Sequence, residues 1–255
     1  MTDLFTHSKR RIARAREHIA NLDIETKAFF ESKPWTSVNE PNPDKPDEIL
    51  GKIRFTSRFP DNVFNLGEES IEGLRAALDK CAFATAGNPS SKSAYFPIAD
   101  SAGQLETEVI GRGRCKDIPP DILTFFRAFQ PYKGGNNLVW ALNKARQPSI
   151  HGLFSIAAAY PAGSARLRVT GRITSGPSVI VDPAWNRDKN EIAFFKVGAG
   201  SEFEYNLDFS LYVAFNEPDV IRGSALVPTL SAMASEVERI VLATETECLR
   251  LGLIK

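Results

Sequence analysis

The spacing of the apolar residues changes near residue 160, and this change restricts the folds that the chain can adopt. Before it, apolar residues recur at steps of three and four, as at Ile12, Ala15 and Ile19, which is the spacing of an amphipathic helix. After it, apolar and polar residues alternate, most clearly from 203 to 215, which predicts one long strand there. One more helical stretch follows. Helices grouped before strands favour an α+β fold over alternating βα units with a parallel sheet.

We therefore expect helices packed on a mainly antiparallel sheet, with a long N-terminal and a long C-terminal helix. Residues 1–160 are predicted to be helix-rich and residues 161–220 to form an antiparallel meander, followed by the last helix over 228–252. One strand, predicted over 49–59, lies among the helices and can be paired only if it joins the later strands. This favours a single interwoven domain over 1–255.

Three local patterns in the first sixty residues give sharper predictions. The first helix is expected over 8–31 and ends before Pro34. The stretch 40–46 holds three prolines, which cannot donate to a ladder of hydrogen bonds, so a loop is expected there. In the following strand, period-two alternation predicts that Lys52 and Arg54 face outward.

Charge and targeting signals limit the functions that the chain can have. Thirty-one Lys and Arg balance thirty-one Asp and Glu, so the formal net charge is zero. This excludes the strong overall basicity of non-specific nucleic-acid binders. The sequence shows neither a signal peptide nor the about 18 consecutive apolar residues of a membrane span, so we expect a cytoplasmic protein with no membrane contact. The three cysteines form no CxxC pair, and no metal site or cofactor is predicted.

Arg146 and His151 are five positions apart, beside a helix break at Pro148. This spacing resembles the RxxxxH motif of HEPN-type ribonucleases, which are helical modules. The resemblance implies cleavage of RNA by general acid–base chemistry, with His151 moving a proton of a ribose 2′-hydroxyl and Arg146 binding the neighbouring phosphate. The structural alternative is a helix-terminal arginine and a hydrogen-bonded histidine. Because GxSxG, Walker A and HExxH motifs are all absent from the sequence, whether the chain is an enzyme stays open.

Arg75 and Asp79 are four residues apart on a predicted helix, hence on one face of it. One interpretation is a ladder of ion pairs that also includes Glu72. The functional interpretation places Arg75, Asp79 and Gln130 at a polar concavity as ligand-binding residues, where a guanidinium would bind an anion beside a carboxylate.

Several short segments resemble an uncharacterised family of bacterial proteins. The resemblance rests on Glu17–Ile19, Ala28–Phe29, Leu74–Asp79, Phe96–Ile98, Gln130–Tyr132, Leu142–Asn143 with His151 downstream, and the last helix from Leu230 through Val237–Val241. Such relatives read Asp-His and Lys-His-Arg where this chain has Asp79-Lys80 and Ile150-His151-Gly152. The family has no established activity, so the resemblance supports a set of candidate residues and no reaction.

Basic residues crowd the first turns of the first helix, from Lys9 to Arg16, where the helix dipole disfavours cations. Their partner is either a nucleic acid or a set of acidic side chains of the same fold, such as Glu236, Glu238 and Glu245 on the last helix. Because the net charge is zero, internal compensation is the favoured interpretation.

From these patterns we expect an interaction or small-ligand-binding module, with a HEPN-like RNA-cleaving or RNA-binding protein as the alternative. The partner is not identified by the sequence. A homodimer is compatible with it, and RNA is a partner only under the alternative.

Overall fold

The computed structural model describes residues 4–87, 90–146, 152–160, 167–180, 183 and 185–254. The chain divides into two compact units, each assembled from separate stretches. The helical unit comprises Met1–Asp23, Asn62–Leu153 and Phe215–Lys255, and the sheet unit comprises Ile24–Asp61 and Phe154–Ala214. That the whole chain is a single interwoven domain stays a prediction.

The helices confirm most of the helical pattern of the sequence. They are α1 (Thr6–Glu31), α2 (Asp61–Thr85), α3 (Ala102–Gln104), the π-helix η1 (Leu105–Ile110), α4 (Pro120–Ala128), α5 (Asn137–Ala145), the 3-10 helix η3 (Asp219–Ile221) and α6 (Leu226–Arg250). The long first and last helices lie within a few residues of the predicted 8–31 and 228–252. The end of α1 continues into the sheet unit.

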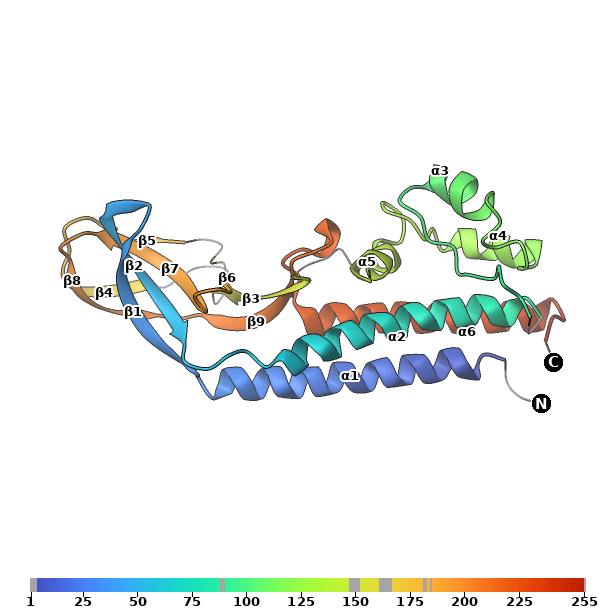
Figure 1. Cartoon of the computed structure of the whole chain (residues 1–255), viewed down its shortest axis with the longest axis horizontal. Coiled ribbons are helices and arrows are strands. Elements are labelled where there is room, and N and C mark those ends of the chain that lie inside the picture. Colours follow the sequence, from blue (N-terminus) through green and yellow to red (C-terminus); the bar gives the residue numbers. More distant parts are fainter. Residues whose placement is uncertain are drawn as a thin grey trace. The chain divides into compact units, whose positions relative to one another are not determined.

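In the helical unit the first part of α1 lies beside α2 and α6 (Figure 1). Each helix buries one apolar stripe, represented by Leu22 on α1, Leu74 and Leu78 on α2, and Leu230 and Ile240 on α6, all fully buried. Burying such a side chain contributes about 1.5–3 kcal/mol relative to leaving it in water. The apolar stripes therefore hold the three helices together.

Two of the basic residues at the start of α1 pair with acidic residues of α6, the partners that the charge balance favoured. Lys9 Nζ lies 2.7 Å from Glu245 Oε1, and Arg16 Nη2 lies 2.7 Å from Glu238 Oε2. Both pairs are partly exposed, and pairs of this kind contribute about 0–1 kcal/mol each. They align the two helices more than they stabilise them.

The sheet unit contains short strands, which pair antiparallel in β1–β2, β2–β7, β4–β8, β5–β7 and β6–β7. Its main sheet has the order β1-β2-β7-β5, with β6 also paired to β7, while β3 pairs with β9 and β4 with β8 in two smaller sheets. The strands are β1 (Trp35–Asn42), β2 (Lys45–Phe55), β3 (Phe154–Ala159), β4 (Leu167–Arg172), β5 (Ser178–Val179), β6 (Trp185–Asn186), β7 (Glu191–Gly198), β8 (Glu202–Leu207) and β9 (Ser210–Phe215). The predicted joining of the early strand to the later ones is confirmed, because β2 pairs with β7.

The loop predicted over 40–46 is wrong, because β1 and β2 form a hairpin that runs through these prolines. β1 is an edge strand, and β2 pairs with β7 only from Glu48 to Arg54, so the prolines lie outside the doubly paired part of the sheet. At the turn, Asn42 Oδ1 accepts the Asp44 N–H at 3.1 Å, and Asn42 Nδ2 donates to Glu48 at 2.9 Å. Side-chain hydrogen bonds thus support the turn.

The predicted meander and the single strand over 203–215 are also wrong. That stretch forms two strands, β8 and β9, which belong to different sheets. Between them Phe209 packs on Phe194, with ring centroids 4.5 Å apart. The alternation of apolar residues continues through the break, so the period alone cannot locate it. β3 is a further strand, inside the region predicted to be helix-rich.

Lys52 was predicted to face outward, but it is only 5% exposed. Its Nζ lies 2.9 Å from Glu191 Oε1 and 3.2 Å from Glu40 Oε2. Arg54, half-buried beside it, binds the other oxygen of both carboxylates, Glu191 at 2.8 Å and Glu40 at 2.6 Å. These four residues, which we call the β2 ion-pair cluster, balance two cations against two anions. Their mutual compensation is what permits charged side chains to be buried.

The α+β fold class, the mainly antiparallel pairing and the two long helices are therefore confirmed. Within the sheet unit the end of α1 packs on the strand region, because Phe29 contacts Phe55 and Phe59 at centroid distances of 6.0 and 4.9 Å. In the described residues, no helix is long and apolar enough to cross a membrane.

Candidate functional site

A cavity of about 310 Å³ opens in the helical unit beside α2 and α5. We call it the α2–α5 cavity. Its walls come from α2, the C-terminal end of α5, η1, and the segments before α3 and after η1. The lining residues are Arg75, Asp79, Tyr95, Phe96, Ile98, Val109, Arg114, Asn143 and Arg146.

Arg75 and Asp79 form the predicted pair and hold the cavity wall in place. Arg75 Nη1 donates to Asp79 Oδ1 at 2.5 Å, and its Nε donates to Asn143 Oδ1 at 2.9 Å. Both residues also bind the backbone of Phe96. Arg75 Nη2 donates to the Phe96 carbonyl at 3.3 Å, and the Phe96 N–H donates to Asp79 Oδ1 at 3.2 Å. Because Arg75 is 7% exposed, these bonds form in a partly dehydrated place where each is strong.

Of the predicted ladder the Arg75–Asp79 pair is confirmed, whereas the Glu72 part is wrong, because Glu72 pairs with Arg146. Arg146 Nε donates to Glu72 Oε2 at 2.8 Å, and both side chains are about half exposed. Arg146 is the C-cap residue of α5, so the end of that helix places its guanidinium at the rim of the cavity.

Tyr95 and Arg114 reach the rim from two backbone segments that are joined to each other. The Tyr95 N–H donates to the Arg114 carbonyl at 3.3 Å, and Cys115 Sγ donates to the Tyr95 carbonyl at 3.3 Å. Their neighbours Phe96 and Cys115 are each 1% exposed. Buried residues thus anchor the backbone at Tyr95 and Arg114 and fix the positions of their Cα atoms at the rim of the cavity.

The charges of the α2–α5 cavity favour an anion. Three guanidinium groups line it, from Arg75, Arg114 and Arg146, against the single carboxylate of Asp79. Arg75 is neutralised by Asp79. Arg146 pairs with Glu72, which is not among the residues that line this cavity. Arg114 makes no ion pair with any residue that the structure describes. A planar guanidinium with unused N–H groups suits a phosphate or a carboxylate.

The structure thus brings together three of the five residues that the sequence singled out, Arg75, Asp79 and Arg146. Gln130 is not among the lining residues. It has φ +50° and its carbonyl accepts the N–H groups of Tyr132 and Asn136, each at 2.7 Å, so its backbone shapes a turn. His151 lies outside the described residues.

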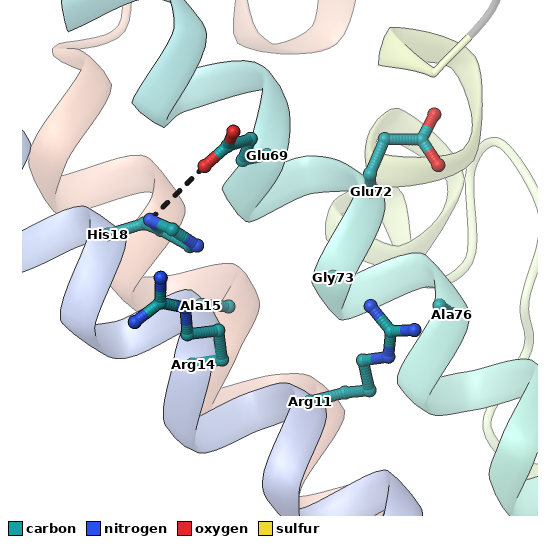
Figure 2. A pocket seen from close by; sticks show the side chains of 8 residues that line it. All are labelled: Arg11, Arg14, Ala15, His18, Glu69, Glu72, Gly73 and Ala76. Carbon is teal, nitrogen blue, oxygen red and sulfur yellow. Dashed lines mark ion pairs between the residues drawn. The ribbon is translucent and has the colours of Figure 1, made fainter. Parts of the chain in front are cut away.

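A second concavity, of about 500 Å³, lies between α1 and α2 (Figure 2). We call it the α1–α2 groove. His18 Nδ1 lies 3.3 Å from Glu69 Oε2 at one end of it. The groove is lined by Arg11, Arg14, Ala15, His18, Glu69, Glu72, Gly73 and Ala76. The sequence placed the arginines in a basic patch and missed the groove, although the spacing of Arg11, Ala15 and His18 puts them on one helix face.

No group of three or more His, Cys, Asp and Glu side chains among the described residues is arranged to hold a metal ion. No protein-family model, curated protein or solved structure matches the sequence. The family resemblance and the HEPN-like motif therefore stay predictions, and the function has to be argued from the two concavities.

Proposed function

We propose that this protein is a small-ligand-binding module whose α2–α5 cavity takes an anionic ligand, through a phosphate or a carboxylate group. The observation that carries the proposal is the excess of guanidinium over carboxylate in the cavity, with Arg114 lacking an ion-pair partner among the described residues. The bacterial origin and the cytoplasmic location remain proposals from the sequence.

The division of labour among the lining residues follows from their contacts. Arg75 and Asp79 form hydrogen bonds to each other and to the backbone of Phe96, so their role is to position the cavity wall. Arg114 is the exposed side chain that a ligand can meet without breaking an existing pair. A charge-assisted hydrogen bond contributes about 1.5–3 kcal/mol, so losing one at Arg114 should weaken binding by roughly 10-fold to 150-fold.

The test is calorimetric titration of the protein with inorganic phosphate, pyrophosphate and citrate. At least one of these anions should bind, and Arg114→Gln should weaken its binding by tenfold or more. Arg112→Gln is the matched control, because Arg112 is a nearby exposed arginine that pairs with Glu108 at 2.7 Å and does not line the cavity. Equal losses in the two variants, or no binding of any anion, would refute the proposal.

The HEPN-like ribonuclease stays as the second candidate, because Arg146 of its motif lies on the rim of this anion-suited cavity. Under this alternative the phosphate belongs to RNA and His151 moves the proton. Incubation of labelled single-stranded RNA with the wild type and with His151→Ala tests it. Cleavage that is lost in the variant supports a nuclease, whereas intact RNA with both proteins rejects it.

A further inference from the structure

The two concavities differ in what they offer a ligand. In the α1–α2 groove, Arg14, Glu69 and Glu72 each already contact another ionisable side chain. In the α2–α5 cavity, the guanidinium of Arg114 has no ion-pair partner among the described residues. The remaining lining residues of that cavity indicate which kind of anion it binds.

An exposed aromatic ring lies at the rim of the α2–α5 cavity. Tyr95 lines the cavity and is 51% exposed. Among the described residues no other ring or cation contacts it, and its hydroxyl makes no hydrogen bond. The Tyr95 N–H donates to the Arg114 carbonyl, so the ring and the unpaired guanidinium start from neighbouring points of the rim. An open aromatic face beside a cation offers stacking to a ligand that carries both a planar ring and an anionic group.

The wall of the cavity keeps two polar groups for a ligand. Arg75 is only a donor, so Asn143 turns its side-chain oxygen to the Arg75 Nε, at 2.9 Å, and its Nδ2 group is left without a partner among the described residues. Asp79 uses Oδ1 both for Arg75 and for the Phe96 N–H, which leaves Oδ2 unpaired within the same part of the chain. Neither Asn143 nor Asp79 is fully buried. The cavity therefore offers one donor group and one acceptor besides the charge of Arg114.

These features together narrow the chemistry of the anion. Inorganic phosphate or a small carboxylate would bind Arg114 and leave the ring and the wall unused. A sugar phosphate adds hydroxyl groups, which both donate and accept and so suit Asp79 and Asn143, but it has no planar ring. A nucleotide supplies all three parts. The cavity volume of about 310 Å³ is near the lower end for small-molecule sites, roughly 300–1,000 Å³, which favours a single nucleotide over a dinucleotide.

We propose that the anionic ligand of the α2–α5 cavity is a free nucleoside 5′-monophosphate. The phosphate binds Arg114, the base stacks on Tyr95, and the ribose, which joins them, exchanges hydrogen bonds with Asp79 and Asn143. Asp79 adds little repulsion to the phosphate, because Arg75 compensates its charge at 2.5 Å. This assignment rests on the function proposed above, since it names the ligand class of the same cavity.

Calorimetric titration with adenosine 5′-monophosphate (AMP), ribose 5-phosphate and adenosine separates the parts of the ligand. We expect AMP to bind. Ribose 5-phosphate lacks the base and should bind roughly fivefold to 150-fold more weakly, the range that base stacking contributes. Adenosine lacks the phosphate and should bind roughly 10-fold to 150-fold more weakly, because it loses the charge-assisted hydrogen bond of Arg114. If AMP binds no more tightly than ribose 5-phosphate, the nucleotide is refuted.

Substitution of Tyr95 tests whether the base stacks on this ring. Tyr95→Ala should weaken AMP binding roughly fivefold or more and leave ribose 5-phosphate binding unchanged, whereas Tyr95→Phe, which keeps the ring, should bind AMP as the wild type does. Because the side chain is half exposed, both variants should fold, and thermal unfolding checks this. Equal losses for AMP and ribose 5-phosphate in Tyr95→Ala, or no loss for either, would contradict the stacking.

The same titrations distinguish the nucleotide from the general anion site. Arg114→Gln should weaken AMP and ribose 5-phosphate alike. If simple anions bind through Arg114 but AMP gains nothing over them, the nucleotide is wrong and the anion site stands. If neither AMP nor any simple anion binds, both proposals fail. An oligoadenylate that binds far more tightly than AMP would make RNA the ligand and overturn the free nucleotide.

Discussion

Replacing Lys52 by methionine, which removes the charged Nζ and keeps an unbranched apolar side chain one atom shorter, should destabilise the sheet unit. Lys52 and Glu191 have side chains only 6% exposed and lie 2.9 Å apart. The substitution leaves the Glu191 carboxylate buried with Arg54 as its remaining partner, at 2.8 Å. The free energy of unfolding should fall because the buried Glu191 carboxylate loses one of its two cationic partners.

The magnitude follows from the burial of the pair. Removing one partner of a buried ion pair costs about 3–5 kcal/mol. Because Arg54 still compensates Glu191, we expect the lower end, about 3 kcal/mol. With a urea dependence of about 1–3 kcal/mol per molar, the midpoint of unfolding should fall by about 1–3 M.

Urea unfolding followed by tryptophan fluorescence measures the change, since two of the three tryptophans, Trp35 and Trp185, lie in the sheet unit. Lys196→Met is the matched control. Lys196 lies on β7, is 37% exposed and pairs with Glu48 at 3.6 Å, so its loss should cost less than about 1 kcal/mol. If Lys52→Met costs no more than this control, the reasoning about the buried cluster is refuted.

The same cluster predicts how stability depends on pH. Burial raises the pKa of Glu191, but hydrogen bonds from Lys52 and Arg54 outweigh it, so its pKa lies below the ordinary 4.5. A carboxyl whose pKa is lowered by folding contributes stability above the unfolded pKa, and that contribution is lost as the pH falls below about 4.5. Unfolding free energies measured between pH 6 and 3 should therefore fall more steeply for the wild type than for Glu191→Gln. Parallel curves would contradict this.

Three smaller predictions concern packing and thiol reactivity. Gly73→Ala should raise the free energy of unfolding by about 0.5–1 kcal/mol, because alanine favours a helix over glycine by this amount and the new methyl group meets Ala15 at an ordinary contact distance of 3.5 Å. Thermal or urea unfolding measures the gain, and a lower stability would contradict the prediction. Gly51→Ala should lower it by about 1–3 kcal/mol, because a Cβ there would lie 2.1 Å from the Phe195 ring; an unchanged urea midpoint would contradict this contact. Burial raises the pKa of the Cys81 thiol to about 12, so a thiol reagent at pH 8 should label it only after unfolding, and rapid labelling of the native protein would show that the helix interior opens.

The helices were the part of the fold that the sequence predicted best. A stripe of apolar residues over many turns, as in α2 and α6, repeats the same signal, and local caps such as Ser101, whose Oγ accepts the Gln104 N–H at 3.2 Å, add to it. The sheet unit was predicted less well. Its strands are short, and their pairing partners lie far apart in the chain, as β2 and β7 do.

For the candidate site, spacing predicted the Arg75–Asp79 pair, because an interval of four residues on a helix fixes the contact. It could not predict that the pair would hold Phe96 or that Arg146 and Arg114 would join it at one cavity. These residues come from separate segments, and no local pattern relates them. The same holds for the α1–α2 groove, which needs the packing of two helices.

The sequence by itself determined the α+β class, the two long helices and the balance of charge, since each depends on composition or on a local period. Only the tertiary structure decided where the charges go. Lys52 shows this most clearly: alternation placed it in solvent, yet it is buried, because Glu40 and Glu191 from two other strands compensate it there. Local period reports which side chains share a face, whereas burial depends on what the rest of the chain brings to that face.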